Sequence, residues 1–378
     1  MRALALLFLL TLMPAAAKAQ DFQTAASHAV ILDYETGEIL FNQDGDVPMP
    51  PASMSKLMTL LMAFEAIDRG ALSLDDELPV SEHAWRTGGA ASGSSTMFLE
   101  VHSRARVADL LRGIIIQSGN DACIVIAEAL SGSESAFAAD MTRRAHELGL
   151  DSASFANATG WPDPDQRISA ADLARLAAII IRDHRELYEL FAEREFTYNG
   201  IRQFNRNPLL SVMEEVDGLK TGHTEESGYG LVASGVRDGV RRIVVYNGME
   251  SERARASEGE RLMRAALADF TVVDLADAGD MVGEADVFLG TAEAVPLRLA
   301  ETARIGLQVR AQRDLRAEIV YEGPVSAPIS EGDVIARLEI SAPGTETRSF
   351  PLEAAADVPQ KGMVGRALAG LSSLFGLN

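Results

Sequence analysis

Short apolar runs predict a β-hairpin near each end of the first 270 residues. The first pair of runs covers residues 29–32 and 39–41, and the second covers residues 231–234 and 243–246. A short polar segment containing glycine separates the two runs of each pair, as in a hairpin. We therefore expect strands at both ends of this region.

Between the hairpins, apolar residues recur at the spacing of buried helix faces. This pattern predicts helices near residues 56–67, 107–130, 136–148 and 170–182, and a further helix near residues 251–270. Strands at both ends with helices between them favour one antiparallel sheet covered by helices, an α+β fold. We assign residues 20–272 to this domain.

After residue 272 the pattern changes to period two, clearest at residues 305–309 and 334–340. Residues 273–357 are therefore predicted to form a small all-β domain. It carries no evident chemistry, so a spacer or a platform for partners is favoured over a substrate-binding module.

The two ends of the chain carry targeting features. Residues 1–19 combine Arg2, a short apolar run and an Ala-Lys-Ala site ending at Ala19, which is typical of a cleaved signal peptide. The apolar run is too short to span a membrane, although an uncleaved anchor stays an alternative.

Residues 358–378 are predicted to form a C-terminal amphipathic helix. Its apolar residues fall at helical spacing on one face: Met363, Val364, Ala367, Leu368, Leu371, Leu374 and Phe375. Such a helix would lie in the membrane interface. A docked helix and a frayed tail are the alternatives.

Charge and cysteine content narrow the class of protein. The 34 basic and 55 acidic residues give a net charge of −21, which disfavours nucleic acid as a partner. Cys123 is the only cysteine, so no intramolecular disulfide can form and the thiol is expected to be a small buried hydrophobe. Scattered histidines and the lack of a glycine-rich phosphate loop predict neither a metal nor a cofactor.

Lysine is rare in this chain. Only Lys18, Lys56, Lys220 and Lys361 occur among the 34 basic residues, and the others are arginines. A desolvated amine can lose its proton and act as a base, whereas a guanidinium stays charged. We therefore expect Lys56 and Lys220, within the main domain, to be functional; coding bias is the alternative.

Polar residues beside these lysines form a pattern. Ser53 and Lys56 lie three residues apart at the start of a predicted helix, and therefore on one face. Ser118 and Asn120 follow a long apolar stretch, and Lys220 begins Lys-Thr-Gly before a predicted strand. Taken singly, these could be a solvated helix turn, a loop and a strand end.

In this order, Ser-x-x-Lys, Ser-x-Asn and Lys-Thr-Gly resemble the signature of penicillin-binding proteins and class A β-lactamases. More closely, the chain resembles the D-alanyl-D-alanine carboxypeptidases of the penicillin-binding protein 5 type, in peptidase family S11. The segments that carry the resemblance are residues 51–53, 117–123, 199–203, 205–207 and 217–224. It implies a serine β-lactamase/DD-peptidase-like fold.

The resemblance also implies roles. Ser53 would be the acylated nucleophile, and neutral Lys56 the base that takes its proton. Lys220 would help to keep that amine neutral. Ser118 would relay the proton to the leaving D-alanine, and Asn120 would hold the peptide amide.

Binding roles follow in the same way. The backbone N–H groups of Ser53 and His223 would form the oxyanion hole. Thr221, Gly222 and Arg241 would bind the terminal carboxylate of the substrate.

Two points qualify this assignment. Arg242 is adjacent to Arg241 and competes for the carboxylate. Residues 157–163 lack the glutamate with which β-lactamases deacylate, and match the peptidases instead. Penicillin is therefore expected to stay on Ser53.

The resemblance implies an exported enzyme that trims peptidoglycan stem pentapeptides and is inhibited by β-lactam antibiotics. Its place would be the periplasm, attached through the C-terminal helix to the outer face of the inner membrane. An endopeptidase or weak transpeptidase would use the same residues, and a catalytically silent scaffold is a third possibility. The intact set of Ser53, Lys56, Ser118, Asn120 and Lys220 argues against the scaffold.

Overall fold

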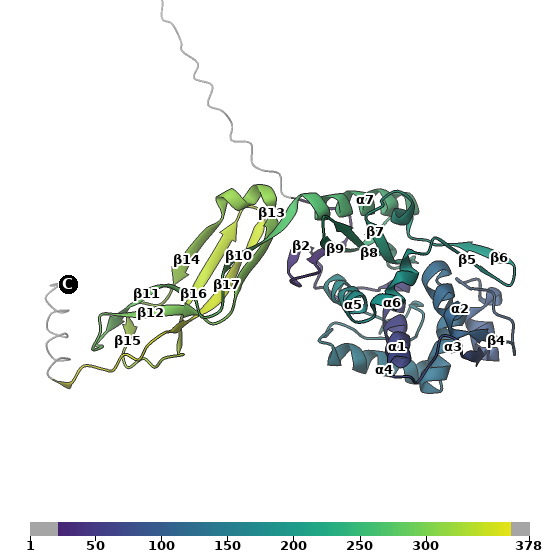
Figure 1. Ribbon diagram of the computed structural model, residues 1–378, viewed down its shortest axis with the longest axis horizontal. Coiled ribbons are helices and arrows are strands. Elements are labelled where there is room, and N and C mark those ends of the chain that lie inside the picture. Colours follow the sequence, from purple (N-terminus) through teal and green to yellow (C-terminus); the bar gives the residue numbers. More distant parts are fainter. Residues whose placement is uncertain (1–21, 364–378) are drawn as a thin grey trace, which may run out of the picture.

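The computed structural model describes residues 22–363. The predicted signal peptide and most of the predicted C-terminal helix, residues 364–378, lie outside the described residues. Residues 358–362 are not helical: Val358 and Gln360 form β-bridges to the β domain. Figure 1 shows two bodies side by side, one of mixed helices and strands and one of strands. The predicted α+β region followed by an all-β region is confirmed.

One antiparallel sheet forms the centre of the first body, in the order β2-β1-β9-β8-β7. Its strands are β1 (His28–Asp33), β2 (Ile39–Gln43), β7 (Val216–Thr224), β8 (Gly228–Arg237) and β9 (Val240–Met249). The two predicted hairpins pair with each other through β1 and β9. The first and last strands of the domain therefore meet in the middle of one sheet.

Helices cover both faces of this sheet (Figure 1). They are α1 (Lys56–Asp68), α2 (Val107–Arg112), α3 (Asn120–Ser131), α4 (Glu134–Glu147), α5 (Ala170–Asp183), α6 (Arg185–Tyr188) and α7 (Glu252–Ala268). Two small two-stranded sheets complete the domain: β3 (Glu77–Pro79) with β4 (Arg104–Arg106), and β5 (Glu195–Tyr198) with β6 (Ile201–Phe204).

Strand β1 shows how the sequence divides the core. Val30 and Leu32 pack into the cluster that contains α1, α3 and α5, while Ala29 and Ile31 pack into the cluster that contains α7. Successive side chains of a strand point to opposite faces of the sheet. A continuous apolar run is therefore what a strand buried on both faces requires.

The predicted helix over residues 107–130 is broken in the structure. A π-turn follows α2, Ser118 adopts a left-handed conformation with φ of 63°, and α3 begins at Asn120. The amide of Gly119 donates to the carbonyl of Gly113 at 2.9 Å, which closes the wide turn. The apolar pattern continues because both halves pack into the same core, so the pattern alone does not reveal the break.

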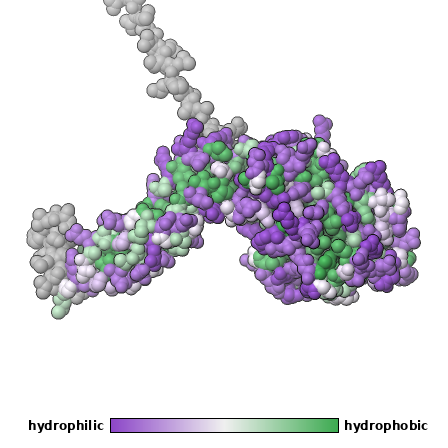
Figure 2. Space-filling view, in the orientation of Figure 1, coloured by the Kyte–Doolittle hydropathy of each residue, from purple (hydrophilic) through white to green (hydrophobic). Residues whose placement is uncertain are grey.

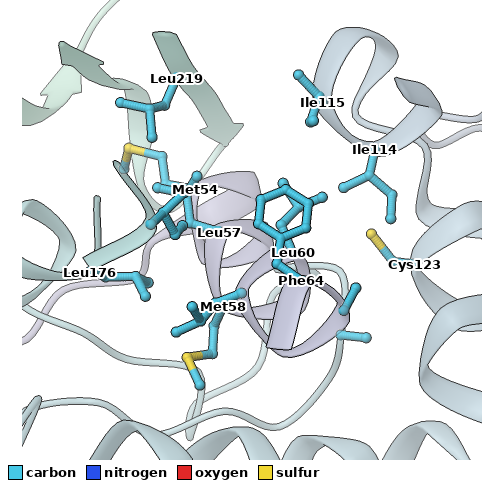
Figure 3. Packing of buried hydrophobic residues seen from close by; sticks show 14 of the residues in the cluster. Met54, Leu57, Met58, Leu60, Phe64, Ile114, Ile115, Cys123, Leu176 and Leu219 are labelled. Atoms are coloured by element: carbon cyan, nitrogen blue, oxygen red, sulfur yellow. The ribbon is translucent and has the colours of Figure 1, made fainter. Parts of the chain in front are cut away.

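Cys123 lies in this core. Figure 3 shows its sulfur among buried side chains such as Phe64 and Ile114. Burial raises the pKa of the thiol to about 12. The interpretation of Cys123 as a small buried hydrophobe agrees with this environment.

The second body holds a two-stranded sheet, β10-β13, and a six-stranded sheet in the order β14-β16-β17-β12-β11-β15. Its strands are β10 (Phe270–Ala276), β11 (Met281–Phe288), β12 (Ala294–Leu299), β13 (Ala303–Gln308), β14 (Arg316–Val320), β15 (Val325–Ser326), β16 (Val334–Ala342) and β17 (Thr345–Ala354). Its apolar side chains form a core of their own.

Aromatic packing joins the two bodies. The ring of Phe22 stands edge-on to those of Phe41 and Phe270, with centroids 5.0 and 5.2 Å away. Arg348 of the β domain also pairs with Glu38 before β2. The β domain therefore contacts the five-stranded sheet at its edge strand β2.

Candidate active site

Ser53 lies in a 3-10 turn, Ala52–Ser55, immediately before α1, rather than inside that helix. Lys56 is the first residue of α1, and its Nζ lies 2.9 Å from Ser53 Oγ. The hydroxyl of Ser55 donates to the carbonyl of Ala52 at 2.9 Å and steadies the turn. The structure therefore brings the predicted nucleophile and base within hydrogen-bond distance.

Lys56 is fully buried. The carbonyl of Thr159, in a loop far along the chain, accepts a further hydrogen bond from its amine. Burial lowers the pKa of Lys56 to about 8, and the positive charge of Arg206 acts in the same direction. The neutral fraction of the amine near neutral pH is thus much larger than in an ordinary lysine, whose pKa is 10.5.

Lys220 lies on β7 and is also buried. Burial holds the pKa of Lys220 well below the ordinary lysine value, and the charges of Lys56 and Arg206 lower it further. The charge of Arg206, which lies within the motif of residues 205–207, thus lowers the pKa of both amines. Its guanidinium donates to Ser95 Oγ at 2.7 Å, which fixes it beside the site.

Ser118 and Asn120 lie at the break between the π-turn and α3. Their side chains are 1% and 6% exposed, and Ser118 Oγ and Asn120 Oδ1 have no hydrogen-bond partner among the described residues. Buried polar atoms are rarely left unpaired in native proteins. Their chain neighbours Asp121 and Cys123 act on the pKa of Lys56, so these two atoms indicate a place where a ligand could supply hydrogen-bond partners.

Strand β7 forms the remaining wall. It is the last strand of its sheet, and no strand of the described region pairs with its outer edge. A Cβ on Gly222 would lie 2.9 Å from the carbonyl oxygen of Pro51 and 3.2 Å from Cβ of Ala52. Glycine therefore allows Lys-Thr-Gly to approach the Ser53 turn closely.

Near the end of β7, Tyr229 lies between two further basic side chains, those of His223 and Arg255. His223 is exposed and stacks on Tyr229 with ring centroids 3.7 Å apart. The guanidinium of Arg255, on α7, lies over the ring of the same Tyr229, 5.5 Å from its centroid. Arg255 is 7% exposed, and its Nε has no partner among residues 22–363.

The structure does not place Arg241 at this site. Both ends of its guanidinium bind Asp217, at 2.7 and 2.8 Å, and its strand position faces Val236 rather than the part of β8 beside Lys220. Arg242 is committed to Asp33 in a buried pair. Both guanidinium groups are already held by carboxylates, so their assignment to the substrate carboxylate stays a prediction that these contacts do not favour. Arg255, by contrast, has an Nε without a partner among the described residues, and its charge lowers the pKa of Lys220. No motif around Arg255 marks it in the sequence.

The loop over residues 157–163 packs against the Ser53 turn. The side-chain oxygen of Asn157 accepts from the amides of Thr159 and Gly160 at 3.1 and 2.8 Å. A Cβ on Gly160 would lie 2.0 Å from the carbonyl oxygen of Ala52, so only glycine fits there. Asn157 thereby holds the Thr159 carbonyl that accepts from Lys56.

Comparison with known proteins identifies the family. Residues 14–250 match the model of the peptidase S11 family, described as D-alanyl-D-alanine carboxypeptidase. The chain belongs to the D-alanyl-D-alanine carboxypeptidase family. Residues 270–360 match the C-terminal domain of penicillin-binding protein 5, so this carboxypeptidase is of the penicillin-binding protein 5 type.

Similar proteins include the D-alanyl-D-alanine carboxypeptidase DacA of Haemophilus influenzae, with 34% identity over 91% of this chain and 88% of that protein. The crystal structure of DacD from Francisella tularensis has a TM-score of 0.78 with 28% identity, and covers 90% of this chain and 95% of that one. An ampicillin-bound structure of penicillin-binding protein D2 from Listeria monocytogenes has a TM-score of 0.57 with 29% identity, over 65% of this carboxypeptidase and 99% of that chain. The expected family and its carboxypeptidase reaction are confirmed.

Proposed function

We propose that this carboxypeptidase works through an acyl-enzyme on Ser53 and that its substrate is the peptidoglycan stem pentapeptide. The observation that carries the proposal is the 2.9 Å contact between Ser53 Oγ and the buried amine of Lys56. An amine with a pKa near 8 can accept the hydroxyl proton as Ser53 attacks. An arginine in its place could not.

The chemistry proceeds in two steps. Ser53 Oγ attacks the carbonyl carbon of the penultimate D-alanine, and its proton passes to Lys56. The backbone N–H groups of Ser53 and His223 stabilise the oxyanion. The C–N bond then breaks, the leaving D-alanine amine receives the proton through Ser118, and water later hydrolyses the ester on Ser53.

Substrate binding uses the edge of β7 and the groups left unpaired around it. The stem peptide adds to the outer edge of β7 as an extended strand, which satisfies its backbone groups. Asn120 binds the peptide amide, while Thr221 and Arg255 hold the terminal carboxylate beside Gly222. Arginine suits this task because its planar guanidinium binds carboxylates in a fixed geometry.

A β-lactam would acylate Ser53 by the same steps. The Listeria neighbour is described in its ampicillin-bound form. Residues 157–163 contribute the Thr159 carbonyl to Lys56 and contain no glutamate to activate a deacylating water. The penicilloyl group is therefore expected to persist on Ser53.

The test combines labelling with product analysis. A fluorescent penicillin is expected to label the protein one-to-one at Ser53, and a pentapeptide to yield D-alanine. Lys56→Arg is expected to slow acylation by roughly 10²–10⁴-fold, as for lost acid–base catalysis. Equal labelling of Ser53→Ala would contradict the nucleophile, a folded Lys56→Arg enzyme with wild-type rates would contradict the base, and cleavage of cross-linked dimers alone would indicate an endopeptidase.

The pH dependence of acylation tests the same base. Below its pKa Lys56 is mainly protonated and cannot accept the Ser53 proton. The acylation rate is therefore expected to rise about tenfold for each pH unit and to level off above about pH 8. Stopped-flow measurements with a chromogenic penicillin would show this limb, and a rate that is flat across it would exclude a titrating Lys56.

We also propose that the protein acts in the periplasm, attached to the outer face of the inner membrane. The support is the signal-peptide pattern of residues 1–19 and the apolar spacing of residues 362–378. No single helix within residues 22–363 is long and apolar enough to cross a membrane. Deletion of residues 362–378 is expected to release the enzyme into the soluble fraction with unchanged activity, and equal retention on membranes would contradict the anchor.

A further inference from the structure

A buried carboxylate, Asp121, stands directly after the Ser118–Asn120 motif at the start of α3. Asp121 is fully buried, and its carboxylate accepts four hydrogen bonds. The donors are the Thr96 hydroxyl at 2.6 Å and the backbone amides of Met97 at 3.0 Å, Leu99 at 3.1 Å and Ala122 at 3.0 Å. The side chain of Asp121 therefore acts only as a hydrogen-bond acceptor.

These bonds fix residues 95–99 against the active-site helix. The amide of Asn120 donates to the carbonyl of Ser95 at 2.8 Å, so the contact is reciprocal. Phe98 lies between two of the bonded residues and has a left-handed φ of 66°, which costs energy in a residue other than glycine. Asp121 holds the segment despite that strain.

The turn over residues 84–88 packs tightly against the start of α3. A Cβ on Gly88 would lie 2.4 Å from the backbone nitrogen of Asp121. The same segment presents Ser95 Oγ to Arg206 at 2.7 Å. Asp121 thus links the Ser118–Asn120 turn, residues 95–99 and the cation beside the two lysines.

We propose that Asp121 is a positioning residue of the acylation step, which clamps residues 95–99 to α3 and so holds Ser118 and Asn120 toward Ser53. This inference rests on the roles proposed above for Ser53 and Lys56. It goes beyond them because the side chain of Asp121 bonds none of the proposed reacting groups.

The charge of Asp121 adds a second, separable effect. It raises the pKa of Lys56 and so opposes the effect of burial. The other groups whose charges interact with Lys56 are Cys123 on α3, Glu134 on α4, Lys220 on β7, and Arg206 in the segment that follows β6. Loss of the Asp121 charge is therefore expected to lower the pKa of Lys56.

Two variants separate the clamp from the charge. Asp121→Asn removes the charge and replaces an acceptor by a donor that faces backbone N–H groups. Thr96→Val removes one hydrogen bond of the clamp and keeps the charge. Acylation by a chromogenic penicillin is followed across pH by stopped flow, together with thermal unfolding of each variant and mass mapping of the labelled residue.

Both variants are expected to lower the plateau rate of acylation, Asp121→Asn by at least about tenfold because charge-assisted hydrogen bonds are lost. Only Asp121→Asn is expected to move the acid limb to lower pH. A folded Asp121→Asn enzyme with the wild-type plateau and limb would overturn the proposal, as would a loss of rate that merely follows the unfolded fraction. If Asp121→Asn does not fold, a wild-type plateau in Thr96→Val overturns it. Labelling at a residue other than Ser53 would instead contradict the proposed function.

Discussion

Two buried amines define the chemistry at the scale of single residues. Lys56 and Lys220 are buried and have no carboxylate within ion-pair distance in the described region. Most other basic side chains of that region are arginines in ion pairs, such as Arg144 and Arg241. Desolvation disfavours an ammonium and lowers the pKa of a lysine, whereas a guanidinium keeps its proton. The rarity of lysine in this chain therefore has a physical counterpart in the site.

Matched variants test whether Arg255, and not Arg241, binds the terminal carboxylate of the substrate. Arg255→Gln is expected to reduce kcat/KM for a D-alanyl-D-alanine peptide by about 10–100-fold, since a charged hydrogen bond to the carboxylate is lost. Arg241→Gln is the control, because its guanidinium is bound to Asp217. It is expected to change stability more than kcat/KM. The reverse order of effects would restore Arg241 to the site.

At the scale of elements, an edge strand and a broken helix build the site together. Strand β7 leaves one edge without a partner strand in the described region, and the helix break before α3 buries Ser118 and Asn120 with side-chain oxygens that have no partner there. The Ser53 turn lies against β7, with Gly222 at the contact. Each element alone is ordinary, and the site exists only because they meet.

Gly222→Ala tests this close approach. The added Cβ would press on the Pro51 carbonyl and the Ala52 side chain, so β7 is expected to shift and acylation of Ser53 to fall by about tenfold or more, as for misplaced reacting groups. Gly235→Ala on β8 is the matched control, because its Cβ would meet mainly the flexible sulfur of Met263, at 2.9 Å. Labelling time courses of both variants at one temperature would decide. Equal rates in Gly222→Ala and wild type would show that the contact is not needed.

At the scale of the whole molecule, the β domain rests on the far edge of the catalytic sheet. The sheet order places β2 at one edge and β7 at the other, so the aromatic contact with the β domain and the active site lie on opposite edges. Figure 2 shows hydrophilic residues spread over the visible face of both domains, in keeping with the net charge of −21. The β domain can thus position the enzyme without touching its site.

Phe270→Ala tests that independence. Phe270 is buried in the junction, and its loss is expected to lower the free energy of unfolding by about 3 kcal/mol. Denaturant unfolding would measure this change, and small-angle X-ray scattering is expected to show a wider range of interdomain arrangements. The acylation rate of the folded enzyme should stay within about twofold of wild type, since truncations affect mainly their own contacts. A large drop in that rate would mean that the two domains are coupled.

The sequence by itself determined the features that depend on local order. Apolar runs located β1 and β9, helical spacing located α1 and α5, and the spacing of Ser53 and Lys56 placed two side chains together. These inferences succeed because strand and helix periods are properties of neighbouring residues. The motifs and the scarcity of lysine indicated the chemistry for the same reason.

Only the tertiary structure decided which distant groups meet. The sequence drew attention to Arg241 and not to Arg255. The structure shows the guanidinium of Arg241 bound to Asp217 and that of Arg255 over the ring of Tyr229. The acceptor from Thr159 and the depressed pKa of Lys56 likewise require packing of segments about a hundred residues apart. Such contacts are set by how the helices and the sheet pack, and no local pattern encodes them.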